Sequence, residues 1–596
     1  MISTKTARQC LVASEESPYD LGSDPLATIR VRAWIEDGAC APTRTVLKPR
    51  CVWLGCPRIK GAAVSYKGTA DREHCSPLPR VAAGSAVGRS ITLEQSGNGR
   101  ELVDEGVYQR TVQRFRDTGV ALPTIAQLAN PQLIPSAVRD ALANVGPDDA
   151  NPLNLFRVHW FNAADRRTQV AVPEHIVLPP ELTGVEAKIV IALGDRFPMI
   201  RCHKVLAAYG CLAPRAITGK FDPTRHRAIW PSTGNYCRGG VAISRLMGGR
   251  GVAVLPQGMS RERFAWLEQW VTDGSDIIRT AGTESNVKEI YDKCQELAVD
   301  PENMIFNQFS EFGNYAVHYH VTGRALDAVF MALQRTDSDL QLRAFVSATG
   351  SAGTIGAGDY LKERHHGSLI AAVEAVECPT MLYNGFGEHN IQGIGDKHIP
   401  LIHNVMNTDV VTAVSDRATD ALGLVFNTEV GRDYLERRCG VSQHIIAGLS
   451  SLGLSSICNV LAAVKVAKHL GLGSRDVILT VATDGAEMYA SERDAIRSRN
   501  FVSGFDELAA AQEFGRHMLG IGTDHLLELT RTDRERIFNL GYFTWVEQRG
   551  IPIEDFQARR DQAFWIGVRR AVADWDRMIG ELNLRTGVLQ NITAGL

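Results

Sequence analysis

Long apolar runs are absent from this sequence, and no stretch approaches the roughly 18 residues that a membrane-spanning helix needs. The first twenty residues also lack a basic segment followed by an apolar one, which is the pattern of a secretory signal. Neither charge is in clear excess, because 64 Lys and Arg nearly balance 67 Asp and Glu and leave a formal net charge of −3. Nothing therefore indicates a membrane or a nucleic acid partner, and we expect a cytoplasmic protein.

Spacing patterns for disulfides and metal ions are missing as well. The 12 cysteines are scattered, and Cys51 and Cys56 have no second close pair of Cys or His that would complete a zinc site. A chain of this size does not need disulfides, so we interpret the cysteines as free thiols. Close histidines at 318–320 and 365–366 point to different faces of a helix, and we interpret them as structural. We predict no metal ion.

The chain is too long for a single hydrophobic core. It has 596 residues, 44% of them hydrophobic and 22% charged, as in an ordinary globular protein. Residues 1–98 show neither helical nor strand periodicity, and we expect an irregular or disordered segment. Residues 99–500 are predicted to form an α/β region of two subdomains. Residues 501–596 are predicted to form a helical C-terminal extension, because 513–529, 534–549 and 553–584 are charged and amphipathic.

The middle region alternates short apolar runs with amphipathic segments. Strands are predicted at 154–161, 187–193, 251–256, 276–279, 304–307, 342–346, 380–382 and 476–481. Helices are predicted at 136–144, with Ser136 as the N-cap, and at 261–271 and 287–297. Such alternation is typical of parallel sheets covered by helices on both faces, in which ligands bind at the carboxyl ends of strands.

One lysine follows the turn after a predicted buried strand. It is Lys204, seven residues after Phe197. A partly desolvated lysine in a cleft can form a Schiff base with an aldehyde. Further on, Ser232 to Asn235 opens a helix, where backbone N–H groups bind carboxylates and the Asn235 amide can donate to a phenolic oxygen. Each feature alone also fits a surface lysine and an ordinary capped turn.

Two further loops contain small polar residues. Ser347 to Gly356 follows the strand predicted at 342–346, and such a loop lets backbone N–H groups converge on a phosphate. It lacks the Lys of a Walker A loop and the order of a dinucleotide fingerprint, which favours a monophosphate over a triphosphate or a pyrophosphate. A flexible linker between strand and helix stays open as the alternative. Ser455 and Ser456 open another helix, where a hydroxyl either faces a ring nitrogen or only caps the helix.

Taken in order, these motifs resemble those of the fold type II pyridoxal phosphate (PLP) enzymes, which include cysteine synthase, threonine dehydratase and the tryptophan synthase β subunit. The resemblance is closest to cysteine synthase and covers roughly residues 154–491. Further segments similar to that family are Gln308-Phe309 with Asn314, His318-Tyr319 and Thr322-Gly323; Gly350 to Lys362; His389 to Gly395 with Ile399-Pro400; and Asp484 to Tyr489.

The resemblance implies two three-layer α/β/α subdomains with PLP between them. It implies that Lys204 holds PLP as an internal aldimine and moves the α-proton of an amino acid substrate. The other implied contacts are Asn235 with the phenolic oxygen; His203, Gly350, Ser351, Ala352, Gly353 and Thr354 with the phosphate; Ser455 or Ser456 with the pyridine nitrogen; and Ser232, Thr233, Gly234, Asn235, Tyr236 and Gln308 with the substrate. With this family in view, we also expect a homodimer.

The activity implied is α-proton removal followed by β-elimination or β-replacement through an aminoacrylate. Two alternatives stay open: an amino acid racemase or isomerase, with Ser351 or Tyr236 as a second acid, and a non-catalytic regulator that binds PLP or an amino acid.

Some residues depart from the cysteine synthase pattern. His203 before the lysine is similar to the tryptophan synthase β subunit, and Tyr236 stands where cysteine synthase has Thr. With Arg238, Tyr236 favours a larger or acidic substrate. An insertion at 430–446 carries Arg432, Arg437, Arg438 and His444, which form either a solvated helix face or an anion-binding lid.

Overall fold

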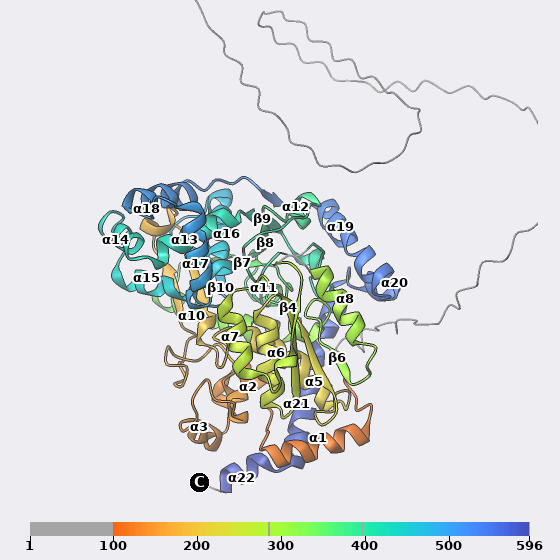
Figure 1. Cartoon of the computed structure of the whole chain (residues 1–596). Coiled ribbons are helices and arrows are strands. Elements are labelled where there is room, and N and C mark those ends of the chain that lie inside the picture. The colour runs from red at the N-terminus through yellow and green to blue at the C-terminus, as the bar shows by residue number, and fades with distance from the viewer. Residues whose placement is uncertain (1–98, 284–286, 396, 595–596) are drawn as a thin grey trace, which may run out of the picture. The chain divides into compact units, whose positions relative to one another are not determined.

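Two mainly parallel sheets carry the fold (Figure 1). The computed structural model describes residues 99–283, 287–395 and 397–594, so the irregular segment expected at 1–98 lies outside the described residues. The larger sheet has the order β1-β2-β10-β7-β8-β9-β11, in which β1 and β11 pair antiparallel at the two edges and the other neighbours pair parallel. The smaller sheet has the order β5-β4-β3-β6 and is parallel throughout.

The strands of the larger sheet are β1 His175–Leu178, β2 Lys188–Leu193, β7 Gln341–Ala348, β8 Leu369–Ala375, β9 Val410–Val414, β10 Asp476–Ala482 and β11 Leu526–Glu528. Those of the smaller sheet are β3 Arg227–Pro231, β4 Arg250–Pro256, β5 Ile277–Thr280 and β6 Asn303–Ile305.

The helices up to the second half of the larger sheet are α1 Glu105–Thr118, α2 Ile125–Ala129, α3 Ser136–Leu142, α4 Pro180–Thr183, α5 Lys204–Ile217, α6 Asn235–Leu246, α7 Arg261–Trp270, α8 Val287–Leu297, α9 Phe312–Val317, α10 Gly323–Thr336 and α11 Ile355–Arg364. Those that follow are α12 Thr380–Tyr383, α13 Asp416–Asn427, α14 Glu429–Arg437, α15 Gln443–Gly448, α16 Leu454–Leu470, α17 Ala490–Asn500, α18 Glu507–Phe514, α19 Arg531–Leu540, α20 Ile553–Ala558, α21 Gln562–Thr586 and α22 Val588–Ala594. Within the described ranges, none of these helices combines the length and the apolar character that a bilayer crossing requires.

Alternate residues of the larger sheet enter different cores. In β2, Val190 and Ala192 belong to the core that contains α5 and α11, whereas Ile189 and Ile191 belong to the core that contains α13 and α16. This follows from the two-residue period of a strand, which sends successive side chains to opposite faces. The smaller sheet likewise lies between α8 on one face and the α5 and α6 core on the other. The predicted α/β architecture with helices on both faces is therefore confirmed.

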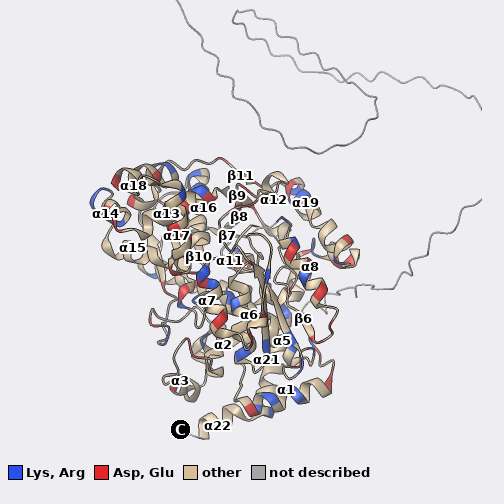
Figure 2. Ribbon diagram, viewed as in Figure 1, with Lys and Arg blue, Asp and Glu red and all other residues tan. Residues whose placement is uncertain are grey.

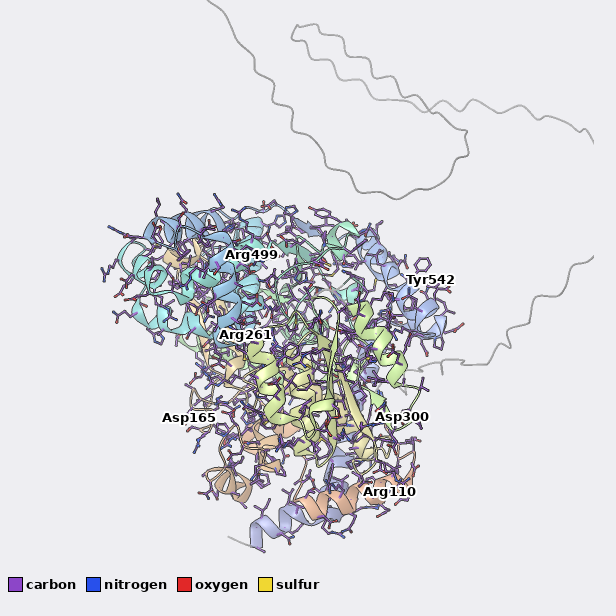
Figure 3. The ribbon with its side chains drawn as sticks, in the orientation of Figure 1. Arg110, Asp165, Arg261, Asp300, Arg499 and Tyr542 are labelled. Atoms are coloured by element: carbon purple, nitrogen blue, oxygen red, sulfur yellow. The ribbon has the colours of Figure 1, made fainter. Side chains whose placement is uncertain are left out.

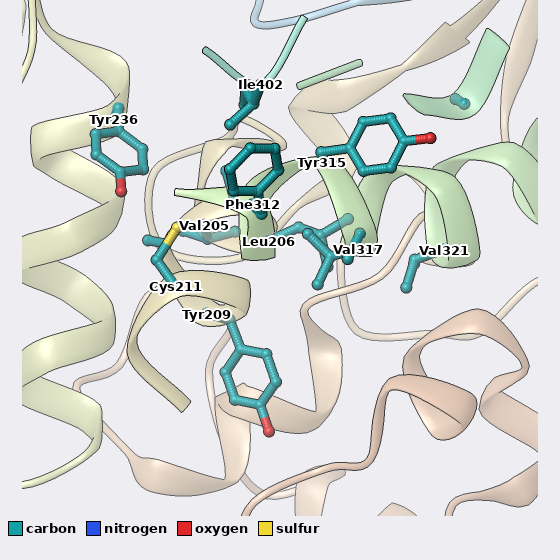
Figure 4. Packing of buried hydrophobic residues seen from close by; sticks show 14 of the residues in the cluster. Val205, Leu206, Tyr209, Cys211, Tyr236, Phe312, Tyr315, Val317, Val321 and Ile402 are labelled. Atoms are coloured by element: carbon teal, nitrogen blue, oxygen red, sulfur yellow. The ribbon is translucent and has the colours of Figure 1, made fainter. Parts of the chain in front are cut away.

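Helix α5, which begins at Lys204, is buried along most of its length. Figure 4 shows Val205, Leu206 and Tyr209 of this helix among apolar side chains of neighbouring elements, including Phe312 of α9. The backbones of α5 and α9 touch where Gly210 faces Gly313, since a Cβ at residue 313 would lie 2.1 Å from the carbonyl oxygen of residue 210. This close packing holds the first residue of α5 in a fixed position.

The C-terminal helices pack on the same core. Helix α21 lies beside α1, at the other end of the described chain, and also contacts α5 and α9 (Figure 1). Its Trp565 ring lies 4.8 Å from the ring of Tyr315 and 5.9 Å from that of Phe312, both on α9. Burial of an aromatic side chain of this size contributes about 2–3 kcal/mol, so the extension predicted from 501 onward stabilises the region that carries Lys204.

Charged residues of both signs are distributed along the described helices and strands (Figure 2). Arg110 of α1 pairs with the buried carboxylate of Asp222 at 2.7 Å, and Asp300 pairs with Arg227; Arg110 and Asp300 are labelled in Figure 3. In the insertion, Arg437 pairs with Asp433 at 3.3 Å and Arg438 with Glu507 at 2.7 Å, which is the arrangement of a solvated helix face rather than of an anion-binding lid.

Several expected elements differ from the structure. Residues 380–382 form helix α12 instead of a strand, because Pro379 precedes them and the Glu374 carboxylate accepts the backbone N–H groups of Met381 and Leu382, at 2.8 Å each. The strand expected at 154–161 is replaced by a 3-10 helix, Pro152–Arg157, which begins where the Asn151 side chain accepts the N–H of Leu153.

Two expected helix boundaries also change. The N-cap of α3 is Pro135, and Ser136 is its first helical residue, with no side-chain cap. The helix expected at 513–529 ends near Gly520, after which Leu526–Glu528 forms β11 and pairs with β9. Pairing at this edge satisfies backbone groups of β9 that a helix would leave exposed.

Candidate active site

The site lies where the carboxyl ends of strands from both sheets meet. Two adjoining cavities, with about 320 and 360 Å³ of empty volume and partly open to solvent, share one group of lining residues. The shared residues are Lys204, Gly350, Ser351, Gly393, Ile394 and Thr483. The order of the strands thus brings together segments that are far apart in the sequence, as expected for ligand sites in parallel sheets.

Lys204 lies at the boundary between the two cavities. Its Nζ donates to Gln308 Oε1 and to Ser351 Oγ, at 3.3 Å each. Gln308 follows β6 of the smaller sheet, and Ser351 follows β7 of the larger one. A single amine therefore reaches loops that belong to both sheets.

The loop after β3 forms one wall of the second cavity. Ser232, Thr233 and Asn235 line it, and helix α6 begins at Asn235. The Ser232 hydroxyl accepts the backbone N–H of Gly234 at 3.1 Å, and Gly234 has a φ of 151°, which favours glycine. Gly234 itself is not among the lining residues. Hydroxyl groups and a helix N-terminus together make a wall that suits a carboxylate.

The loop after β7 forms a cradle in the first cavity. All five predicted residues, 350–354, line this cavity, and α11 begins directly after them. In the described part of the chain, no protein acceptor takes the backbone N–H groups of Gly350, Ser351, Ala352 or Thr354. Donors without acceptors at the N-terminus of a ten-residue helix fit an anion with several oxygens, such as a phosphate.

Glycine and asparagine shape this cradle. The Asn314 side chain donates to Ser351 Oγ at 3.0 Å and to the carbonyl oxygen of Gln308 at 3.2 Å. A Cβ at Gly353 would lie 2.3 Å from Asn314 Oδ1, so this position has no room for a side chain. Asn314 therefore joins the loop at 350–354 to the loop that carries Gln308.

His203 completes the first cavity. Its ring stacks on Trp160 at 5.7 Å and meets His318 edge-on at 5.1 Å, and within the described structure its buried Nδ1 has no hydrogen-bond partner. Burial, together with the neighbouring His318 and Lys204, holds the pKa of His203 well below its ordinary value, so the ring is neutral. An unpartnered buried nitrogen beside the cradle is a further observation that fits a bound anion.

The two serines at the start of α16 do not line the cavities. Ser456 Oγ accepts the N–H of Thr483 at 3.1 Å, whereas Ser455 Oγ is buried without a partner among the described residues. Asn459 and Thr483, which the sequence motifs did not indicate, do line the first cavity. Asn459 lies one turn beyond the serines on α16, which is a positional signal that a search along the sequence can use. Thr483 directly follows β10 and has no such signal.

Tyr236 lines the second cavity, as predicted, but its hydroxyl lies in the core, and Arg238 lines neither cavity. The Tyr236 ring packs edge-on against Trp230 at 5.3 Å, and its hydroxyl points toward Cys211 in the core (Figure 4). Burial raises the pKa of this hydroxyl well above its ordinary value. Arg238 is buried behind Asn235. The geometry thus gives no support to the larger or acidic substrate that these two residues favoured, or to Tyr236 as a second acid.

Comparisons with known proteins place the chain in a family. No family model matches it. Among solved structures, a hydrogen sulfide-producing enzyme from Fusobacterium nucleatum aligns with a TM-score of 0.45 at 21% identity, over 56% of this chain and 98% of that one. A cysteine synthase from Staphylococcus aureus is 28% identical over 277 residues, which are 46% of this chain and 78% of the relative. Cysteine synthase B from Campylobacter jejuni is 30% identical over 257 residues, which are 42% of this chain and 75% of the relative. The chain therefore belongs to the cysteine synthase family, whose members are PLP-dependent lyases and transferases of fold type II.

Proposed function

We propose that this protein binds PLP between its two sheets and catalyses β-elimination or β-replacement on an amino acid after removal of the α-proton. The observation that carries the proposal is the position of Lys204, whose Nζ lies 3.3 Å from Gln308 on one side and 3.3 Å from Ser351 on the other. When bound, PLP would supply an electron sink for the electron pair released at Cα.

The first cavity would hold the phosphate group. The backbone N–H groups of Gly350, Ser351, Ala352 and Thr354, at the N-terminus of α11, offer donors that need no rearrangement. Neutral His203 adds a ring nitrogen. The side-chain amide of Asn235, which lines the second cavity, would donate an N–H to the phenolic oxygen.

The second cavity would hold the substrate. The substrate carboxylate would bind to Ser232, Thr233 and Gln308 and to the N-terminus of α6. All of these donors are uncharged, so the carboxylate would be bound without an arginine or lysine partner. The α-carbon would then lie next to the Lys204 amine, which is the group that removes and holds the α-proton. Because α5 is fixed by its packing on α9, this amine is held in place before the substrate arrives.

The experiment is a comparison of purified wild-type protein with Lys204→Ala. The wild-type protein should carry a visible absorbance band of bound cofactor, and Lys204→Ala should lose it together with all turnover. Lys293→Ala, a partly exposed lysine on α8 outside the cavities, is the matched control and should keep both. An unchanged band in Lys204→Ala would exclude the proposal.

The reaction type is settled by the products. A panel of β-substituted amino acids, with and without sulfide, should give a keto acid and ammonia for elimination or a new amino acid for replacement. Exchange of the α-deuterium with inversion, and with neither product, would instead indicate a racemase. A protein that binds PLP but shows no spectral change with any amino acid would be a regulator.

A further inference from the structure

The side-chain amide of Asn235 is held between two buried charged residues. Its Nδ2 donates to Asp484 Oδ2 at 2.7 Å, and its Oδ1 accepts from Arg238 at 3.0 Å. All three side chains are buried, with 5%, 0% and 2% of their surfaces exposed for Asn235, Asp484 and Arg238. Charge-assisted hydrogen bonds of this kind are strong when water is excluded.

These contacts fix which way the amide points. A flipped Asn235 would set its oxygen against the Asp484 carboxylate and its NH₂ group against the Arg238 guanidinium, so both contacts would become repulsive. In the observed orientation, one N–H of the amide is donated to Asp484, and the second N–H has no acceptor among the described residues. Because Asn235 lines the second cavity, the two charged residues leave the amide with a donor, and not an acceptor, for a ligand bound there.

Both charged residues are themselves held firmly. Arg238 also donates to the carbonyl oxygen of Ile200 at 3.2 Å, in the segment that leads to Lys204, and its guanidinium lies 5.0 Å from the centre of the Trp266 ring. Burial lowers the pKa of Arg238 to about 10, so it remains a cation at neutral pH. Asp484 accepts the Tyr489 hydroxyl at 2.9 Å and lies 3.9 Å from Arg263.

The sequence adds a reason to single out Arg238. Asn235 belongs to the motif that resembles cysteine synthase, whereas Arg238, one turn later on α6, follows the positions at which this chain departs from that pattern. A guanidinium three residues after the asparagine on a helix lies on the same face, so the contact between them is built into α6.

We propose that Arg238 and Asp484 are positioning residues that orient the Asn235 amide, so that its second N–H faces the cofactor cavity. This inference rests on the proposed function in one respect, namely that the acceptor of this N–H is the phenolic oxygen of PLP. Neither Arg238 nor Asp484 lines the cavities, so both act through Asn235.

The test uses the holoenzyme and three variants at the two charged positions: Arg238→Met, Arg238→Lys and Asp484→Asn. The first readout is the ratio of visible to near-ultraviolet absorbance of bound cofactor, which depends on the hydrogen bond to its phenolic oxygen. Arg238→Met and Asp484→Asn should shift this ratio and lower kcat about tenfold, as expected for loss of one charge-assisted hydrogen bond, with KM for the amino acid unchanged. Arg238→Lys keeps the cation and should recover part of the wild-type ratio. Arg245→Met, an exposed position further along α6, is the control and should change neither quantity.

A double-mutant comparison separates positioning from general support. In an Asn235→Ala background, Arg238→Met should produce no further change in the absorbance ratio, because the side chain on which it acts is gone. An equal effect of Arg238→Met in both backgrounds would overturn the inference, as would a wild-type ratio in both Arg238→Met and Asp484→Asn. If Arg238→Met does not fold, Arg238→Lys and Asp484→Asn decide, and wild-type ratios in both would overturn it. Wild-type protein without a cofactor band that depends on Lys204 would instead refute the proposed function.

Discussion

The guanidinium group of Arg569, on the C-terminal helix α21, lies 3.2 Å from the carboxylate of Asp359, on the helix α11 that follows the loop at 350–354. Asp359 is fully buried and also accepts from Tyr315 at 2.6 Å and from Asn404 at 2.8 Å. Burial raises the pKa of Asp359, and Arg569 opposes that rise. The C-terminal extension thus supplies the cation for a buried anion on α11.

Removal of the Arg569 guanidinium should lower the stability of the folded protein. Arg569→Met leaves the Asp359 carboxylate without its cation, and we expect the free energy of unfolding to fall by about 3 kcal/mol. The affinity for PLP should fall as well, because α11 begins directly after the loop that we propose to bind the phosphate. Denaturant titration and PLP titration of the cofactor-free protein measure the two effects.

Arg577 on the same helix provides the matched control. It pairs with Glu581 at 2.7 Å on the surface, where both side chains are more than half exposed. Because exposed ion pairs contribute little, Arg577→Met should change stability by about 0.5 kcal/mol or less. Equal losses in the two variants would contradict a structural role for the buried pair.

Ala352, in the loop at 350–354, has a left-handed backbone conformation, with a φ of 61°. A residue with a Cβ is strained there by about 1 kcal/mol, and glycine is not. Ala352→Gly should therefore keep or raise stability, whereas Ala357→Gly, within α11, should lower it by about 1 kcal/mol. Urea unfolding of both variants tests this, and a loss in Ala352→Gly as large as that in Ala357→Gly would show that the conformation carries no strain.

Gly353 is the position of the cradle with least room. In Gly353→Ala the new methyl group would displace Asn314 Oδ1, now 2.3 Å from that point, and so disturb the contact of Asn314 with Ser351. We expect the dissociation constant for PLP to rise by about tenfold or more. Gly580→Ala, on α21 with open space around it, should leave PLP binding unchanged. Wild-type affinity in Gly353→Ala would place the phosphate elsewhere.

His403 makes stability depend on pH. It is buried, and burial together with Arg559 lowers its pKa from 6.5 to about 3, so the folded protein keeps it neutral. Between these two values the unfolded chain binds more protons than the folded one, so stability is lost as pH falls below 6.5. When the pH falls from about 7.5 to about 5.5, the free energy of unfolding of His403→Gln should decrease by about 1.4 kcal/mol less than that of the wild type. Denaturant titrations at the two pH values measure this difference, and an equal decrease in the two proteins would contradict the prediction.

The elements that the sequence predicted correctly are those with strong local signals. The run at 187–193 is apolar and β-branched and forms β2, and the amphipathic segment 287–297 forms α8. The wrong predictions at 154–161 and 380–382 arose where a side chain just outside the segment decides the local structure. At 380–382 the apolar run is short, and the Glu374 carboxylate caps it as a helix.

The candidate site divides in the same way. Lys204, the loop at 232–235 and the loop at 350–354 are recognisable because a turn that opens a helix needs small and polar residues in a fixed local order. Thr483 was missed, since a threonine after a strand has no local pattern that marks it as a lining residue.

By itself, the sequence determined the alternation of strands and helices and the order of the loops, because both depend on residues that are neighbours along the chain. Only the tertiary structure decided what each loop faces. Asn235 and Asp484 are 249 positions apart, and they meet because the two sheets pack with the carboxyl ends of their strands toward one cavity. Likewise, only packing could show that Tyr236 turns into the core and that Arg238 holds Asn235, since the direction of a buried side chain depends on the space and charges that distant segments provide.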